Sequence, residues 1–310
     1  MKIVFFGTGK LGLPVLKTLI ESSHSLLAVV TQPDKKFGRG WNVLPQPMKA
    51  FIEKARPGIP VYQPEKVSDQ KFIEDLKKIE ADLFIVVDYG QILTKEILAL
   101  PSKYCINLHP SLLPKYRGAS PVNRAILNGD IETGNSIIIM NDKMDAGDIL
   151  MKSFMKIGPE ENAESLFERL SHNGKDLIIK VLDEIACGRE HPKKQNEDEA
   201  TYAPKLKKED GKIDWSLSAR DIHRKIRGLK PWPGAFTYLD GKILKILTAD
   251  VIAFTDERYK PGQICVEKGL TVCCGKDAIS VTKLQLEGKR KMNAREFLLG
   301  HKLNKDKQLG

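Results

Sequence analysis

The sequence has few cysteines and no pattern that would pair them. Five occur among 310 residues, at the irregular positions 105, 187, 265, 273 and 274. The count is odd and no Cys-x-x-Cys motif occurs. Neither a disulfide framework nor a zinc site is therefore indicated. We expect a protein that works in a reducing compartment and binds no metal.

Long apolar runs are also lacking. The opening run, MKIVFFGTG, is too short for a signal peptide and is typical of a first β-strand. No stretch approaches the roughly 18 apolar residues that cross a bilayer. The composition, 41% hydrophobic and 29% charged, is that of a globular chain large enough for two domains. We therefore expect a cytoplasmic protein with no membrane partner. We also expect a monomer.

Net charge is nearly missing from the first two thirds of the chain. Residues 1–205 hold 28 Lys and Arg against 27 Asp and Glu, a net +1, whereas residues 206–310 hold 22 against 13, a net +9. A basic module joined to a neutral one suggests a polyanionic partner, with nucleic acid as the first candidate. A lysine-rich solvated surface would give the same count.

Apolar patterning in the first half alternates between strands and helices. The run 2–9 predicts a strand that ends in glycines, 13–22 has helical spacing, and 24–34 predicts a second strand. The same alternation continues with a helix over 71–81 and strands within 82–93 and 104–110. Strands alternating with helices predict an α/β fold with a doubly wound, mostly parallel sheet of Rossmann-like type.

The pattern then changes. Residues 135–157 predict a hairpin and 160–187 a long helix, while 188–205 are polar and without periodicity, as expected of a linker. The short β-rich runs within 206–310 predict a small OB-like β-barrel. We therefore predict a catalytic domain over 1–187, a linker over 188–205 and a basic domain over 206–310.

A glycine-rich turn lies between the first strand and the first helix. The segment GTGKLG, residues 7–12, fits the Gly-x-Gly-x-x-Gly pattern of dinucleotide-binding sites in the required place. A nicotinamide-dependent oxidoreductase is therefore one alternative. However, Asp34 follows a proline in a turn and precedes a basic loop, which is a poor position for holding a ribose. The glycines could equally serve a tight turn or another anion.

A second constellation consists of Asn107, His109 and Asp145. The first two are expected on one strand, two residues apart, so both side chains leave the same face near its carboxyl end, where open α/β sheets bind ligands. Asp145 lies in a turn that could reach the imidazole and favour its protonated form. An amide and an imidazolium directed at one point would stabilise an oxyanion on a carbonyl carbon. The residues favour acyl transfer to an amine, although an Asn and a His bonded into a loop would look the same.

Two segments resemble a known family. NLHPSLLPKYRGASP, residues 107–121, followed by MDAGDI, residues 144–149, is similar to the signature of the folate-dependent formyltransferases. Residues 29–54, 86–98 and 201–237 resemble the branch that acts on methionyl initiator tRNA. The resemblance covers nearly the whole chain.

The resemblance implies a reaction and a set of site residues. The formyl group of 10-formyltetrahydrofolate would pass to the amino group of methionyl initiator tRNA by direct attack of the amine. Asn107, His109 and Asp145 would be the catalytic trio, and Arg39 would engage the tRNA acceptor end, with Lys35 and Lys36 adding charge. The expected folate contacts are Ser111, Leu112, Leu113 and Pro114, with Gly90 to Leu93 lining the pterin pocket.

The sequence departs from the family pattern at several positions. Gly9 and Lys10 stand where the family commonly has a proline and an acidic residue, and Asp88 stands where an alanine is common. Two alternatives therefore stay open beside the oxidoreductase. One is a formyltransferase for a sugar nucleotide or another small amine. The other is a non-catalytic RNA-binding protein.

Overall fold

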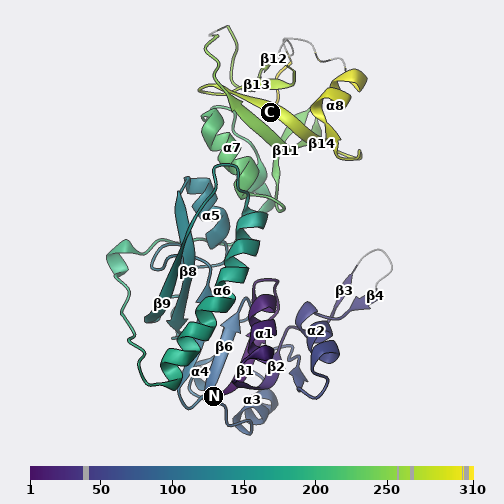
Figure 1. Ribbon diagram of the computed structural model, residues 1–310. Helices are drawn as coiled ribbons and strands as arrows, with labels where there is room; N and C mark the ends of the chain where they lie inside the picture. The colour runs from purple at the N-terminus through teal and green to yellow at the C-terminus, as the bar shows by residue number, and fades with distance from the viewer. Residues whose placement is uncertain (38–41, 257, 266–268, 302, 304–306) are drawn as a thin grey trace. The chain divides into compact units, whose positions relative to one another are not determined.

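The computed structural model describes residues 1–37, 42–256, 258–265, 269–301, 303 and 307–310 (Figure 1). By its contacts the chain divides into two compact units. Unit 1 comprises Met1–Gly118, Glu132–Met155 and Phe167–Ala203, and unit 2 comprises Ala119–Ile131, Lys156–Leu166 and Pro204–Gly310. Unit 2 thus includes two segments that precede the C-terminal third. The predicted division into 1–187, 188–205 and 206–310 stays a prediction.

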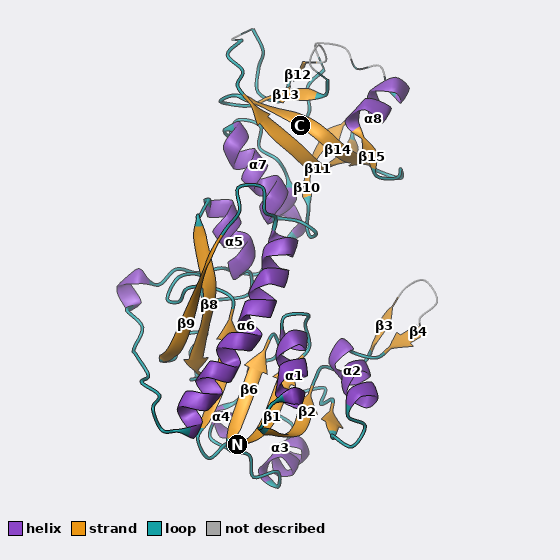
Figure 2. Cartoon of the chain, viewed as in Figure 1, coloured by secondary structure: helices purple, strands orange, loops and turns teal. Residues whose placement is uncertain are grey.

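Unit 1 is built on a seven-stranded sheet with the strand order β5-β2-β1-β6-β7-β8-β9 (Figure 2). Strands β5, β2, β1, β6 and β7 pair in parallel, and β8 pairs antiparallel with β7. The mostly parallel sheet of the sequence prediction is therefore confirmed. The strands are β1 (Lys2–Gly7), β2 (Ser25–Val30), β5 (Val61–Tyr62), β6 (Leu83–Val87), β7 (Tyr104–His109), β8 (Glu132–Ile139) and β9 (Ile149–Lys156), and a separate hairpin joins β3 (Lys35–Phe37) to β4 (Asn42–Leu44).

Helices cover both faces of this sheet. One face packs against α1 (Gly12–Glu21), α2 (Pro47–Ala55) and the part of α6 (Ala163–Ala186) that belongs to unit 1. The opposite face packs against α3 (Gln70–Lys77) and α4 (Lys95–Leu98). Parallel strands buried on both faces read as continuous apolar runs, as in β6.

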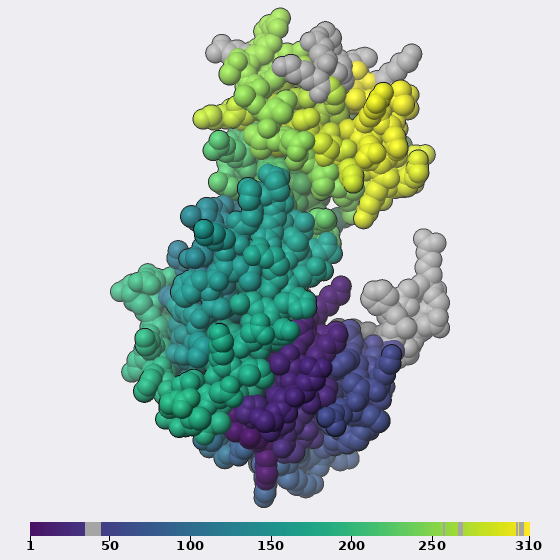
Figure 3. All heavy atoms as spheres, viewed as in Figure 1, coloured from purple at the N-terminus to yellow at the C-terminus, as the bar shows by residue number. Residues whose placement is uncertain are grey.

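The long helix α6 has its inner face buried against the centre of the sheet. Its residues Leu177, Ile178, Val181, Leu182 and Ile185 pack with Ile106 and Leu108 of β7. Figure 3 shows the helix beside the N-terminal segment, and the Ser171 hydroxyl donates to the carbonyl of Leu11 at 2.9 Å. The apolar period of about 3.6 residues that predicts this helix is therefore also what fixes β7 in the core.

Unit 2 contains an antiparallel sheet with the order β10-β11-β14-β13-β12, and β15 pairs with β14. Among the described residues no pairing joins β10 to β12, so the antiparallel sheet is confirmed and closure into a barrel is not. The elements are α5 (Pro121–Asn128), the 3-10 turn η2 (Lys208–Gly211), α7 (Ala219–Gly228), β10 (Ala235–Leu239), β11 (Lys242–Ile252), β12 (Ile264–Cys265), β13 (Thr271–Cys273), β14 (Ala278–Leu286), β15 (Met292–Asn293) and α8 (Ala294–Gly300).

Helix α7 illustrates how local sequence sets an element of unit 2. Ser218 caps it by accepting a hydrogen bond from the N–H of Asp221. The apolar residues Ile222 and Ile226 face the core of the unit, and Lys225 and Arg227 lie in the last turn, where cations suit the helix dipole. Within the described part of the chain, no helix is long and apolar enough to cross a membrane.

Candidate active site

The carboxyl end of β7 presents Asn107 and His109 on the same face of the sheet. Asn107 pairs with Val86 of β6 on one side and with Ile138 of β8 on the other. His109 is only 4% exposed, and Ser136 is its partner on β8. Burial of β7 on both faces leaves these two side chains little freedom. The spacing of two residues on one strand is therefore confirmed as the feature that brings them together.

Asp145 reaches this strand end from the turn between β8 and β9. Its Oδ2 lies 3.6 Å from Nδ1 of His109, which is longer than a hydrogen bond but close enough to attract the imidazole when the ring is protonated on both nitrogens. Its Oδ1 accepts a long hydrogen bond of 3.4 Å from the amide of Asn107, and Oδ2 accepts one of 2.8 Å from the N–H of Gly118. The three predicted residues therefore converge in unit 1.

The imidazole of His109 also contacts the main chain. Its Nε2 lies 2.9 Å from the carbonyl oxygen of Tyr116. A carbonyl can only accept, so Nε2 carries the proton and Nδ1 is the nitrogen that faces Asp145. In this arrangement, donation to a substrate oxygen needs a second proton on Nδ1, or exchange of the Tyr116 carbonyl for the substrate.

The turn that follows β7 contains the four predicted folate contacts. Its main chain is fastened to Ser136, whose hydroxyl accepts from the N–H of Leu113 at 3.0 Å and donates to the carbonyl of Ser111 at 2.7 Å. Leu113 is fully buried, its peptide bond to Pro114 is cis, and only Leu112 of the four is partly exposed. Any contact with a ligand would therefore come from Leu112 and from the backbone of the turn.

The segment 188–205, which the sequence predicted to be a linker, forms hydrogen bonds that hold the site in place. The side-chain amide of Gln195 donates to the carbonyls of Asp145 and Gly147, both at 2.8 Å. Its oxygen in turn accepts from the guanidinium of Arg117, which also pairs with Glu197 at 2.9 Å. Ion pairing with Glu197 raises the pKa of Arg117, which is 3% exposed.

Residues further along the same segment also contact the turn after β7. Residue 117 forms a β-bridge with Tyr202, and Thr201 accepts from the N–H of Tyr116 through its hydroxyl at 2.9 Å. Sequence reasoning missed Gln195, Arg117 and Thr201, because they lie outside any periodic pattern. Gln195 and Thr201 bond to backbone atoms, and Arg117 bonds to side chains of the same polar segment. The one available signal was the sequence KYRG itself, which stands next to the predicted folate turn.

The glycine-rich turn serves packing and close approach of the chain. A Cβ on Gly12 would lie 3.0 to 3.3 Å from Phe5, Met48 and Val87, so this position needs the smallest residue. Asp34, the acidic residue closest to a dinucleotide pattern, is paired with Lys49 at 2.6 Å and accepts from Gln63 at 2.8 Å. The hydrogen bond from Lys49 lowers the pKa of Asp34. A ribose would have to displace both partners.

Arg39 lies outside the described residues. The β3–β4 hairpin that flanks it is described through its backbone pairing of Lys35 with Leu44 and of Phe37 with Asn42. The role predicted for Arg39 therefore stays a prediction.

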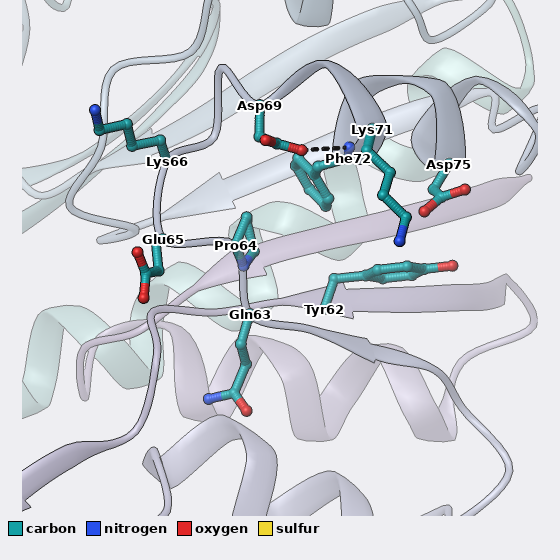
Figure 4. A pocket seen from close by; sticks show the side chains of 9 residues that line it. All are labelled: Tyr62, Gln63, Pro64, Glu65, Lys66, Asp69, Lys71, Phe72 and Asp75. Atoms are coloured by element: carbon teal, nitrogen blue, oxygen red, sulfur yellow. Dashed lines mark hydrogen bonds between the residues drawn. The ribbon is translucent and has the colours of Figure 1, made fainter.

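A pocket of about 620 Å³ lies elsewhere on unit 1, at the start of α3 (Figure 4). The rings of Tyr62 and Phe72 lie 5.9 Å apart in its wall, and Asp69 caps the helix by accepting from the N–H of Phe72. None of the trio lines it. Its two lysines are balanced by three carboxylates, so the lining favours no single class of ligand; the lining residues are Tyr62, Gln63, Pro64, Glu65, Lys66, Asp69, Lys71, Phe72 and Asp75.

Comparison with known proteins adds to this geometry. The family model described as formyl transferase matches residues 1–182, and that of the formyl transferase C-terminal domain matches residues 205–302. The chain belongs to the formyl transferase family. The resemblance found in the sequence is thereby confirmed, and the oxidoreductase alternative loses its support.

Relatives within the formyl transferase family match end to end. A methionyl-tRNA formyltransferase of Citrifermentans bemidjiense is 44% identical over 100% of this chain and 96% of its own length. One from Caldanaerobacter subterraneus is 44% identical over 98% of each chain. A crystal structure of the N-formyltransferase from Helicobacter canadensis, in complex with folinic acid and dTDP-3-aminofucose, superposes with a TM-score of 0.67 at 18% identity, over 91% of this chain and 99% of that one. This last likeness shows a shared fold.

Proposed function

We propose that the protein transfers the formyl group of 10-formyltetrahydrofolate to the free amino group of methionyl initiator tRNA. The observation that carries the proposal is the convergence of Asn107, His109 and Asp145 at one strand end. End-to-end relatives with that activity in their names support the choice of acceptor. We expect the protein to act in the cytoplasm as a monomer, with no metal.

The chemistry follows from what each group can donate or accept. The acceptor amine attacks the formyl carbon, and the carbonyl oxygen becomes a tetrahedral oxyanion. The amide of Asn107 would stabilise this oxyanion, joined by an N–H of His109 once Nδ1 is protonated or the substrate has replaced the Tyr116 carbonyl. His109 would then give a proton to the departing nitrogen of the folate. Asp145 would stabilise positive charge on the ring and, through water, help to accept a proton from the amine.

The turn 111–114 is proposed to hold the folate. Its attachment to Ser136 of β8 supports this role, because these hydrogen bonds fix the backbone of the turn that follows His109. The segment Gly90 to Leu93 would line the pterin pocket; Gly90 has a positive φ of 86° and the side chain of Ile92 is 84% exposed, so an apolar surface is open to a ring.

Unit 2 is proposed to bind the tRNA. Residues 206–310 carry a net charge of +9, which favours a polyanion and predicts affinity that falls with salt. Arg39 and the loop around it would engage the acceptor end, where recognition depends on opened single-stranded nucleotides rather than on a groove. We also keep the OB-type barrel as the proposed form of the antiparallel sheet in unit 2, since that fold often binds nucleic acid.

The proposal is tested by incubating the protein with 10-formyltetrahydrofolate and methionyl initiator tRNA. Uncharged tRNA and free methionine are the controls. We expect formyl-methionyl-tRNA only with the charged tRNA. Binding of tRNA without any transfer would instead support the non-catalytic RNA-binding protein.

The loop provides a second test. Deletion of residues 35–42, or Arg39→Ala alone, is expected to raise the KM for methionyl-tRNA while the KM for the folate stays unchanged. Full activity of the deletion variant, together with transfer to a small amino sugar nucleotide, would support the alternative acceptor and contradict the proposal.

A further inference from the structure

Asp88 is the first residue after β6, and its carboxylate occupies the space that a side chain at position 9 would fill. A Cβ placed on Gly9 would lie 1.6 Å from Oδ2 of Asp88 and 2.5 Å from its Cγ. Such separations are impossible, so the absence of a side chain at Gly9 is what admits this carboxylate to the turn between β1 and α1. The two departures from the family pattern are therefore a single feature of the structure.

The backbone of Asp88 is held at the end of β6 by hydrogen bonds from the turn after β1. Its carbonyl accepts hydrogen bonds from the N–H groups of Thr8 and Gly9, both at 3.2 Å, and its φ is +50°. The next residue, Tyr89, is tied in the same way, because its carbonyl accepts from the Thr8 hydroxyl at 3.0 Å and from the Gln32 amide at 3.2 Å. These hydrogen bonds join the residues that follow β1, β2 and β6 to one another.

Unlike the backbone of Asp88, its carboxylate is not hydrogen-bonded in the part of the chain that the structure describes. Within the described ranges, no residue donates a hydrogen bond to it or forms an ion pair with it, although it is exposed at the edge of the sheet. Partial desolvation by the surrounding turn raises the pKa of Asp88. A carboxylate that is accessible and unpaired can receive a charge-assisted hydrogen bond from a cationic donor.

Asp88 also follows the strand that pairs with β7. Val86 pairs with Asn107 in the parallel ladder, and Asp88 and His109 each stand two residues further on, at the carboxyl ends of these neighbouring strands. Neighbouring strands are about 4.8 Å apart. The proposed folate turn lies on the other flank of β7, attached to Ser136 of β8. The Asp88 carboxylate lies on the β1 side of β6, against Gly9, whereas the proposed pterin pocket begins two residues later, at Gly90.

We infer that Asp88 binds the amino group of the acceptor as its ammonium ion, on the β1 side of the trio. This inference rests on the proposed formyl transfer and names the group that selects the free amine. The step is binding alone: no bond to Asp88 forms, and the ammonium loses its proton to water before the neutral amine attacks.

The test compares the affinity of two charged initiator tRNAs for the full-length protein. One carries methionine, and the other carries its α-hydroxy analogue, which has the same shape but no amine. We expect the unmodified protein to bind the methionyl form about tenfold more tightly. Asp88→Asn should reduce this preference to about twofold or less and leave the KM for the folate unchanged. Glu74→Gln, an exposed carboxylate on α3, is the control with the same change in charge and should keep the preference.

A second variant moves the carboxylate without removing it. Gly9→Ala places a methyl group where Oδ2 lies, so it should reduce the preference as Asp88→Asn does. The double variant Gly9→Ala, Asp88→Ala should behave like Asp88→Ala alone, because the clash is gone. A tenfold preference retained by Asp88→Asn, or a rise in the KM for the folate only, would overturn the assignment while formyl transfer by the unmodified protein stands. Absence of transfer by the unmodified protein would overturn the proposed function as well.

Discussion

The carboxyl ends of β6 and β7 lie side by side in the sheet, but their polar groups are held differently. At β7, His109 contacts the carbonyl of Tyr116, and Asp145 accepts from Gly118 and Asn107. At β6, the backbone of Asp88 is bonded, yet no described residue bonds its carboxylate.

The difference indicates that the two strand ends have different functions. Groups that stabilise developing charge must already be oriented when the reaction begins, because reorganisation would add to the barrier. A group that recognises a substrate must keep its bonding capacity until the substrate arrives. We therefore interpret the end of β7 as the reacting side and the end of β6 as the receiving side.

Removal of the trio should have the largest effect. His109→Ala and Asp145→Ala are each expected to lower kcat by at least about 100-fold, because the oxyanion loses a donor or the group that supports it. Affinity for tRNA, measured by filter binding, should stay nearly unchanged. Near-normal turnover in either variant would contradict the distinction between the two strand ends.

Loss of the hydrogen bonds from Gln195 should have an intermediate effect. Gln195→Ala removes the donor that holds the carbonyls of Asp145 and Gly147, so Asp145 is expected to drift from His109. We expect kcat to fall about tenfold with both KM values within about twofold, because small misplacements of reacting groups are costly. Steady-state kinetics measure both constants. Lys194→Ala, an exposed neighbour, is the matched control and should change neither.

A smaller effect is expected at the folate turn. Ser136→Ala leaves the N–H of Leu113 and the carbonyl of Ser111 without their partner in a buried place, which should cost about 1–3 kcal/mol of unfolding free energy. The looser turn should raise the KM for the folate several-fold and spare the KM for tRNA. Denaturant titration and kinetics test the two parts. Ser102→Ala, whose hydroxyl is exposed, should stay within about 0.5 kcal/mol of the unmodified protein.

The smallest effect is expected at Tyr89, beside Asp88. Its hydroxyl is buried without a hydrogen-bond partner among the described residues, and desolvation raises its pKa to about 12. Tyr89→Phe removes an unsatisfied polar group, so we expect unchanged kinetics and equal or slightly greater thermal stability. A marked loss of activity would mean that this hydroxyl, and not only the Asp88 carboxylate, receives a ligand.

The predictable parts of this protein depended on local pattern. Apolar period placed the parallel strands and α6, and the spacing of Asn107 and His109 put both side chains on one face. The contribution of Gln195 was hidden, because it lies in a polar segment without periodicity and bonds to backbone carbonyls of any residue type. Gly9 and Asp88 were each visible as unusual, but only the pairing of β1 with β6 brings them into contact.

The bridge between residue 117 and Tyr202 bears on where this chain can be cut. A fragment ending at residue 187 would keep all seven strands of the first sheet and still lack Gln195, Thr201 and the β-bridge. We expect such a fragment to have little activity, because nothing in it holds the carbonyls of Asp145 and Gly147 as Gln195 does. A shortened or recombined enzyme should therefore extend to residue 203, or contain another segment that makes the same contacts with the turns after β7 and β8.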